Sequence, residues 1–197
     1  MSDDRKLQRQ YRSAQAKFET RADENGGPVI AGYFAVFNQP TELWPGCIEQ
    51  IAPGAFASSL GGDVRALIDH DTRLVLGRST AGTLTLREDQ TGLYGEIKIN
   101  EQDTDAMNLY ARVQRGDVSQ CSFGFDIKAE DYIVSEDGQT CTWTVDDVVL
   151  YEVSVVTFPA YEATSVSARS VEDAASLQES RLNRRKKELM ERIKNHA

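Results

Sequence analysis

Two apolar stretches decide the fold expected of this sequence: Val118–Ile127, VSQCSFGFDI, and Val145–Thr157, VDDVVLYEVSVVT. Both are rich in β-branched or aromatic residues and are long enough to form strands. A polar excursion and a short strand-like segment at Cys141–Thr144 separate them. They are therefore predicted to be the longest strands of a β-rich domain.

Shorter segments of the same character lie on the N-terminal side. Strands are predicted at Pro28–Asn38, Cys47–Ile51, Val64–Ile68, Leu74–Leu76, Thr83–Leu86 and Leu93–Ile99. Between Gln102 and Arg115 apolar residues recur at spacings of three and four, which predicts a helix with Gly116 as its C-terminal cap. Pro53–Leu60 predicts a second, short helix. The expected fold class is therefore α+β, mainly β with helices interspersed.

The chain of 197 residues is expected to form one domain with a single core, over residues 26–169. Residues 1–25 are polar with few apolar anchors and predict a flexible N-terminal arm. Residues 170–197 predict a separate helical tail, with Ala175, Leu182 and Leu189 at seven-residue intervals. This stripe is thin for a coiled coil, so docking on a partner or partial disorder is expected of the tail.

The net charge of −9 is unevenly distributed. From Gln178 to Ala197 there are seven Lys/Arg and three Asp/Glu, so this end carries +4 and the rest of the chain −13. An acidic body disfavours nucleic acid as the main partner. The basic tail is interpreted either as a contact for an acidic partner or as a solvated helix.

The three cysteines, Cys47, Cys121 and Cys141, form no CxxC unit and cannot all pair with one another. We interpret them as reduced, in a cytoplasmic protein without structural zinc. No run of eighteen apolar residues predicts a membrane span. The polar N-terminus lacks the apolar region of a secretory signal, so the protein is expected to work in the compartment where it is made.

The strand around Ser122 places a hydroxyl opposite an aromatic face. With a period of two, Phe123 and Phe125 share the face that belongs in the core, whereas Ser122 and Gly124 share the other. A glycine beside a serine would let a substrate backbone approach closely. The alternative is an ordinary serine on a solvated face. Ser119, three residues earlier, would point to the opposite face from Ser122.

The second long strand carries a carboxylate in an apolar run. Tyr151, Val153 and Val155 are predicted to share one face, and Glu152 and Ser154 the other. Burying Glu152 without a partner is costly. Three interpretations are open. The face that carries Glu152 is solvated, or the carboxylate pairs with an arginine, or it orients a histidine as in a serine triad.

His70 is one of only two histidines, and the other, His196, lies next to the C-terminus. His70 follows a predicted strand and stands between two aspartates, where a packing or hydrogen-bonding role is also open. If the protein performs acid–base chemistry near neutral pH, His70 is the imidazole available for it.

Several sequence blocks, in order from Gly32 to Arg169, resemble the prohead maturation proteases of tailed bacteriophages. They are GYFAVFN at 32–38, EQIAPGAF at 49–56, IDHD at 68–71, LGR at 76–78, GTL at 82–84, SFGF at 122–125 and EVSVVTFPAY at 152–161. The resemblance implies a serine peptidase related to the herpesvirus assemblins, with a β-barrel flanked by helices.

The resemblance also implies a function and a site. The expected activity is cleavage of scaffold segments from the major capsid protein, and of the protease itself, inside the procapsid in the host cytoplasm, with the protease absent from the mature virion. By matching blocks, His70 is the expected base and Ser122 the nucleophile. Glu152 is the first choice for the third member, with Asp71 and Asp126 in reserve. No metal or cofactor is expected, and a homodimer is expected by analogy with the herpesvirus relatives.

Two other functions compete with this hypothesis. One is a non-enzymatic capsid-associated or scaffold protein built on a β-barrel, which would not need His70 and Ser122 to lie close together. The other is a serine esterase, although the sequence lacks the G-x-S-x-G motif of the common α/β hydrolases.

Overall fold

The structure, a computed structural model, describes residues 9–135 and 140–158, and within them the fold is mostly β with one α-helix. The larger sheet has the order β1-β10-β11-β5-β4, with β6 also paired to β11 and β7 paired to β6. The smaller sheet has the order β2-β3-β9-β8. The strands of the larger sheet are β1 (Gln10–Gln15), β4 (Thr41–Trp44), β5 (Cys47–Ile51), β6 (Arg65–Ile68), β7 (Asp71–Arg78), β10 (Gln120–Val134) and β11 (Cys141–Val156). Those of the smaller sheet are β2 (Glu19–Ala22), β3 (Pro28–Val36), β8 (Leu84–Glu88) and β9 (Gly92–Lys98).

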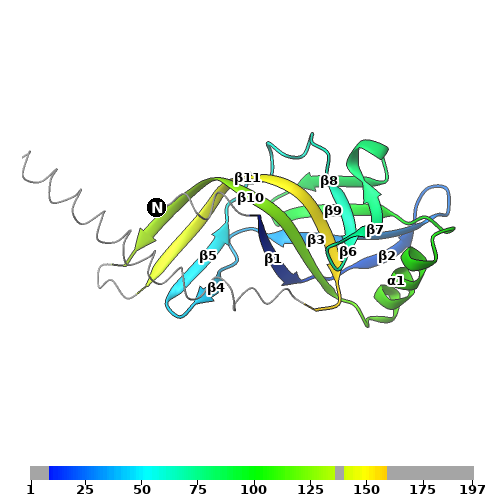
Figure 1. Ribbon diagram of the computed structural model, residues 1–197, viewed down its shortest axis with the longest axis horizontal. Helices are drawn as coiled ribbons and strands as arrows, with labels where there is room; N and C mark the ends of the chain where they lie inside the picture. The colour runs from blue at the N-terminus through cyan, green and yellow to red at the C-terminus, as the bar shows by residue number, and fades with distance from the viewer. Residues whose placement is uncertain (1–8, 136–139, 159–197) are drawn as a thin grey trace, which may run out of the picture.

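The two long predicted strands form an antiparallel ribbon, β10 and β11, that arches along the molecule (Figure 1). The segment at Cys141–Thr144 is the beginning of β11 rather than a separate strand. β11 pairs in parallel with β5 near its start and with β6 near its end. The ribbon therefore connects the other strands of the larger sheet, since β1 pairs with β10, and β5 and β6 pair with β11.

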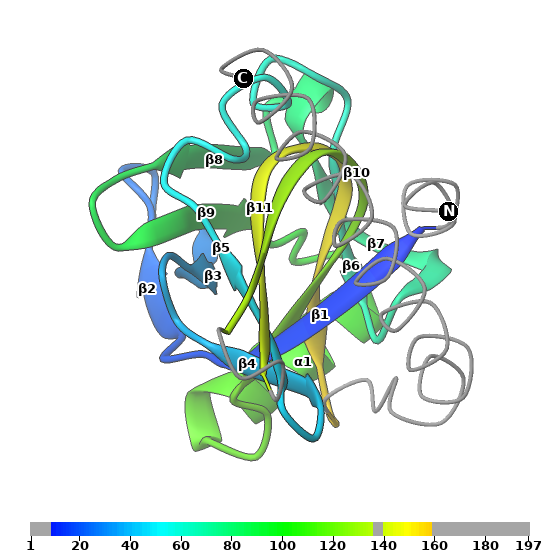
Figure 2. The ribbon, with the colours of Figure 1, turned by 90° about the vertical axis from the view of Figure 1, so that its left-hand side faces the viewer.

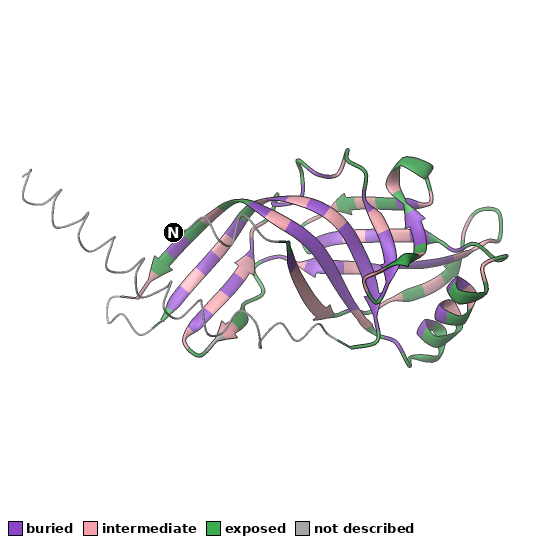
Figure 3. Ribbon diagram, in the orientation of Figure 1, coloured by how far each residue is buried: buried purple, intermediate pink, exposed green. Residues whose placement is uncertain are grey.

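The main hydrophobic core includes residues of both sheets, among them Phe34 of β3, Phe123 and Phe125 of β10, and Val153 of β11. Buried and less buried positions alternate along β5 and the first part of β11, whereas residues 121–125 of β10 and 152–156 of β11 are buried on both faces (Figure 3). The prediction that Phe123 and Phe125 face the core is confirmed.

A β-bulge interrupts this alternation in β11. Gly124 is opposite Glu152, but Phe125 is opposite Leu150, so Tyr151 is the extra residue. Leu150 consequently joins Val153 in the core, although strict alternation would place them on opposite faces. The predicted sharing of a face by Tyr151 and Val153 is wrong for this reason: Tyr151 is half-buried and donates a hydrogen bond from its hydroxyl to Asp126.

The predicted helix at Gln102–Arg115 is confirmed as α1 (Thr104–Arg115). Its N-cap, Asp103, accepts hydrogen bonds from two backbone N–H groups of the first turn, and Gly116 ends the helix at φ 87°. The predicted helix at Pro53–Leu60 is wrong: this segment is a series of turns closed by bonds such as Ala57 N to Gly54 O. Gly54 adopts φ 89° there, a left-handed conformation that a helix does not continue through. A 3₁₀ turn, η1 (Ser79–Ala81), follows β7.

The predicted N-terminal arm is wrong over Gln10–Ala22, because these residues form β1 and β2. β1 adds to the edge of β10 and lies across it in Figure 2, and β2 adds to β3. Arg12 of β1 binds the buried carboxylate of Glu49 with Nε (2.5 Å to Oε1) and Nη2 (3.0 Å to Oε2). This part of the chain therefore belongs to the folded body.

The predicted absence of paired cysteines is also wrong. Cys47 and Cys141 form a disulfide between β5 and β11, where the two residues are register partners with Cα atoms 4.6 Å apart. The 94 residues between them hide this proximity from the sequence. The inference of a reducing compartment from the cysteine pattern therefore loses its basis. Cys121 is a buried free thiol.

Two remaining predictions concern membranes and the tail. Among the described residues no helix is long and apolar enough to cross a membrane. The predicted helical tail at 170–197 lies outside the described residues.

Candidate active site

His70 lies in the two-residue turn that joins β6 to β7. Ile68 and Asp71 pair across the hairpin, and both turn residues have positive φ, 48° at Asp69 and 60° at His70. Positive φ at both central positions is the conformation of a type I′ hairpin turn, which favours glycine, asparagine and aspartate. Asp69 therefore suits its position, whereas His70 adopts a conformation that is uncommon for a non-glycine residue and that the surrounding structure must hold.

Asp69 fastens this turn to the end of β11. Its backbone N–H donates to Val155 O at 3.0 Å, and its carboxylate accepts from the backbone N–H (2.6 Å) and the hydroxyl (3.0 Å) of Thr157. The turn that holds His70 is thus tied to the strand that carries Glu152.

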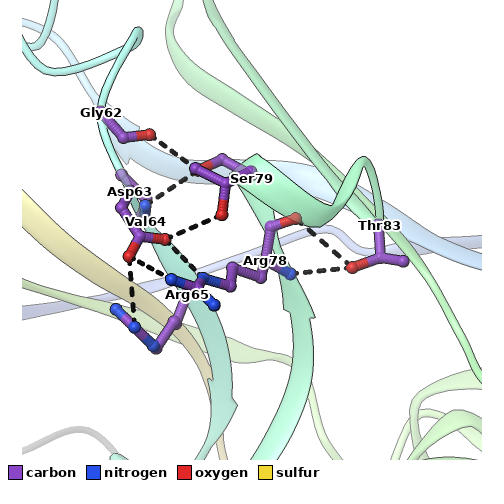
Figure 4. Close-up of polar contacts among 8 residues, drawn as sticks. Gly62, Asp63, Val64, Arg65, Arg78, Ser79 and Thr83 are labelled. Atoms are coloured by element: carbon purple, nitrogen blue, oxygen red, sulfur yellow. Dashed lines mark hydrogen bonds and ion pairs between the residues drawn. The ribbon is translucent and has the colours of Figure 1, made fainter.

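A second network holds the other end of the β6–β7 hairpin (Figure 4). Asp63 accepts from Arg78 Nε at 2.7 Å and forms an ion pair with Arg65 at 3.2 Å, while Ser79 Oγ accepts from Val64 N at 2.9 Å. Hydrogen bonding from Arg78 lowers the pKa of Asp63 to about 2, so the carboxylate is ionised at neutral pH. The hairpin is therefore fixed both at its base and at its turn.

Glu152 binds the imidazole of His70. The distance from His70 Nδ1 to Glu152 Oε1 is 2.7 Å, and the Glu152 residue is only 6% exposed. Because a carboxylate accepts hydrogen bonds, Nδ1 carries the proton, and Nε2 of the neutral ring is left as the base. Nε2 is buried and has no hydrogen-bond partner in the described part of the chain.

Gly124 provides the space that this pair requires. A Cβ atom at position 124 would lie 2.6 Å from Glu152 Oε1 and 3.0 Å from Tyr11 Cε1. The Tyr11 ring stands edge-on to the His70 ring, with centroids 4.8 Å apart. The sequence suggested that Gly124 admits a substrate backbone; in the structure the Glu152 carboxylate and the Tyr11 ring occupy this space.

Ser122 lies on the same face of the sheet as Glu152. It is the register partner of Ser154, two residues beyond Glu152, and Ser154 Oγ is 3.4 Å from His70 Nδ1. Ser122 is completely buried, and its hydroxyl has no hydrogen-bond partner among residues 9–135 and 140–158. The structure thus brings Glu152 and His70 into contact and places Ser122 on the same face of the sheet, without a described hydrogen bond between Ser122 and His70.

The reserve candidates lie elsewhere. Asp71 pairs with Arg73, whose hydrogen bonds lower the pKa of Asp71 to about 2. Asp126 accepts from the Tyr151 hydroxyl at 2.7 Å. Ser119 is exposed and lies just before β10. The described hydrogen bonds of His70 involve none of these three residues.

Sequence reasoning missed three residues around the imidazole: Asp69, Tyr11 and Ser154. Ser154 had a signal, because alternation put it on the face of Glu152. Asp69 and Tyr11 had none, since their contacts depend on the conformation of a turn and on the pairing of β1 with β10. Within the described residues no cluster of three or more His, Cys, Asp or Glu side chains could hold a metal ion.

The order of hydrogen-bond donors and acceptors decides what chemistry this arrangement can perform. A carboxylate on Nδ1 fixes the imidazole tautomer and would stabilise the imidazolium once Nε2 takes up a proton. A serine hydroxyl beside such a base is a nucleophile that the base can activate. Catalytic hydrogen bonds are often long or misaligned without substrate, so the lack of a hydrogen bond between Ser122 and His70 does not exclude Ser122 as the nucleophile.

Comparisons with known proteins identify the family of the chain. The model of the family "Caudovirus prohead serine protease" matches residues 16–177. The prohead protease of Enterobacteria phage HK97 is 32% identical over 144 residues, which are 71% of this chain and 59% of that protein, so the match spans less than two thirds of the relative. The structure of the bacteriophage T4 capsid assembly protease aligns with a TM-score of 0.49 at 12% identity, over 76% of this chain and 97% of the other. The chain belongs to the caudovirus prohead serine protease family.

Proposed function

We propose that this protein is a serine endopeptidase of capsid maturation in which Ser122 is the nucleophile, His70 the general base and Glu152 the residue that orients His70. His70 Nε2 would take the Ser122 proton as the hydroxyl attacks the scissile carbonyl, and would later protonate the leaving amine. The observation that carries the proposal is the 2.7 Å contact of Glu152 with Nδ1, which leaves Nε2 as a buried base without a described partner. The Ser122 hydroxyl, on the same face of the sheet as Glu152, is likewise buried without a described partner.

Family membership supports the choice of substrate. We infer that the chain cleaves scaffold segments of the major capsid protein of its phage, and itself, in the procapsid interior, and that it is absent from the mature virion. We also propose that the strands from β1 to β11 belong to a herpesvirus-protease-like barrel, that the basic tail over 170–197 contacts the scaffold segment, and that the protein self-associates as a homodimer. No cofactor enters this mechanism.

Co-expression of the full chain with the capsid protein of the same phage tests the activity. Ser122→Ala should leave the capsid protein and the protease chain at full length, as measured by intact mass spectrometry of purified procapsids. Ser119→Ala is the matched control, because this serine lies three residues away, is exposed, and should not alter cleavage.

Sedimentation with procapsids shows whether each variant is incorporated. Normal cleavage by an incorporated Ser122→Ala variant would remove Ser122 from the mechanism. An absence of cleavage even with the wild-type chain, incorporated at normal levels, would favour the non-enzymatic scaffold protein.

A further inference from the structure

The Glu152 carboxylate has a second partner besides His70. Ser154 is completely buried and donates a hydrogen bond from its hydroxyl to Glu152 Oε2 at 2.6 Å. The two carboxylate oxygens thus have different partners: Oε1 faces His70, and Oε2 faces Ser154. We infer that Ser154 is a positioning residue that fixes the plane of the Glu152 carboxylate and, through it, the tautomer and orientation of the His70 ring. This inference rests on the proposed function.

The geometry separates Ser154 from the role of nucleophile. Its hydroxyl lies 3.4 Å from His70 Nδ1, the ring nitrogen that Glu152 already binds. The Ser154 proton is directed to the carboxylate, so it is not available to the imidazole. Ser122, the register partner of Ser154, has a hydroxyl without a described partner, so its proton is not committed to another described group.

The side chain of Glu152 needs such a constraint. The terminal torsion of a glutamate is broad and roughly two-fold, so one hydrogen bond does not fix the carboxylate plane. Glu152 is buried, so a carboxylate oxygen that loses its hydrogen-bond donor is costly to leave unpaired. Without Ser154 the carboxylate would turn toward other donors, and the bond to Nδ1 would no longer be held in line.

The first measurement reads the imidazole directly. The chain has only two histidines, so ¹⁵N-histidine labelling yields signals from His70 and from His196, an internal reference near the C-terminus. At a pH where the ring is neutral, His70 in the wild type should be the Nδ1–H tautomer. In Ser154→Ala the His70 signals should show a mixture of tautomers, and in Ser154→Thr, which keeps the hydroxyl, the Nδ1–H form should return.

The second measurement is kinetic, with a peptide derived from a mapped cleavage site of the capsid protein. Ser154→Ala should lower kcat about 10- to 100-fold, the effect of one lost hydrogen bond to a charged group. KM should change by less than about twofold, because Ser154 makes no contact with the substrate in this mechanism. Ser154→Thr should recover most of kcat if its thermal unfolding midpoint shows that the extra methyl group is accommodated.

Ser59→Ala is the matched control. Ser59 is also a buried serine bound to β11: its hydroxyl donates to Val148 O at 2.6 Å and accepts from Leu150 N at 3.0 Å. Its loss should lower stability without changing the tautomer of His70 or kcat. If both variants changed kcat equally at equal stability, the effect of Ser154 would be structural and the inference would be overturned.

A serine-reactive fluorophosphonate separates failure of this inference from failure of the proposed function. Mass spectrometry should find the label on Ser122, in the wild type and, formed more slowly, in Ser154→Ala. Labelling of Ser154 instead would overturn the inference. If no serine were labelled, the proposed function would fail, and the tautomer measurement alone would then decide whether Ser154 positions His70.

Discussion

Replacing Gly124 by alanine should separate activity from stability. The added Cβ would lie 2.6 Å from Glu152 Oε1, about 0.8 Å short of the 3.4 Å at which ordinary contact begins. Oε1 is the end of a side chain, so it can move away without a shift of the backbone, and the main cost falls on the hydrogen bonds of the carboxylate. The same atom accepts the hydrogen bond from His70 Nδ1 at 2.7 Å, so the movement breaks or bends that bond.

The expected effect on catalysis is large. A displacement near 1 Å in a catalytic group typically costs about 10²-fold in rate. We therefore expect kcat/KM of Gly124→Ala to fall about 10²-fold on a capsid-derived peptide. The thermal unfolding midpoint should fall by no more than about 2–4 °C, the shift that corresponds to about 1 kcal/mol in a domain of about 150–250 residues. The Tyr11 ring, 3.0 Å from the same Cβ, adds a small stability cost.

Gly61→Ala is the matched control, because a Cβ at position 61 would have nothing within 4 Å. It should leave both kcat/KM and the unfolding midpoint near the wild-type values. Wild-type kcat/KM in a folded Gly124→Ala protein would refute the reasoning, since catalysis would then not depend on the placement of Glu152 Oε1.

Three further changes test other parts of the site and fold. Asp69→Ala removes both carboxylate bonds to Thr157, so kcat should fall at least about tenfold. Asp69→Asn tolerates positive φ and can still accept from the Thr157 N–H, so it should retain more activity in steady-state kinetics. Equal losses in the two variants would argue that the bonds between Asp69 and Thr157 do not hold His70 in place. Asp71→Asn should change kcat/KM by less than about twofold between pH 6 and 9, because the pKa of Asp71 is near 2 and its partner is Arg73 rather than His70; a tenfold loss would return Asp71 to the triad. The double replacement Cys47→Ala and Cys141→Ala should lower the free energy of unfolding by about 2–4 kcal/mol in urea titrations, and wild-type stability would show that the disulfide does not contribute.

The elements of the fold were predictable where a local pattern determines them. Aromatic and branched residues identified β3, a short apolar run identified β5, and alternation identified β6. Apolar residues at spacings of three and four identified α1, with Gly116 as its cap. The short helix at Pro53–Leu60 was wrong because the left-handed Gly54 ends any helical run that includes it. β1 was missed because its residues are polar, and it is stabilised by pairing with β10, more than 100 residues later in the chain.

The sequence predicted which residues belong to the site better than it predicted how they contact one another. Alternation placed Glu152 and Ser122 on the outer face, and the scarcity of histidine singled out His70. The structure brings Glu152 to His70 as expected, while the catalytic roles of the three residues remain predictions. The disulfide, the Asp69 tether and the contact of Tyr11 with His70 depend on distant segments meeting in space, which no local pattern in one sequence encodes.

The bulge at Tyr151 limits how this family can change in length. Leu150 and Val153 both face the core only because one extra residue stands between the two parts of β11. Removing that residue would restore strict alternation, and either the core residues before the bulge or Glu152 after it would turn to the wrong face. Single-residue deletions in this part of β11 should therefore be lost by selection, and sequence alignments of relatives should show substitutions at position 151 without gaps.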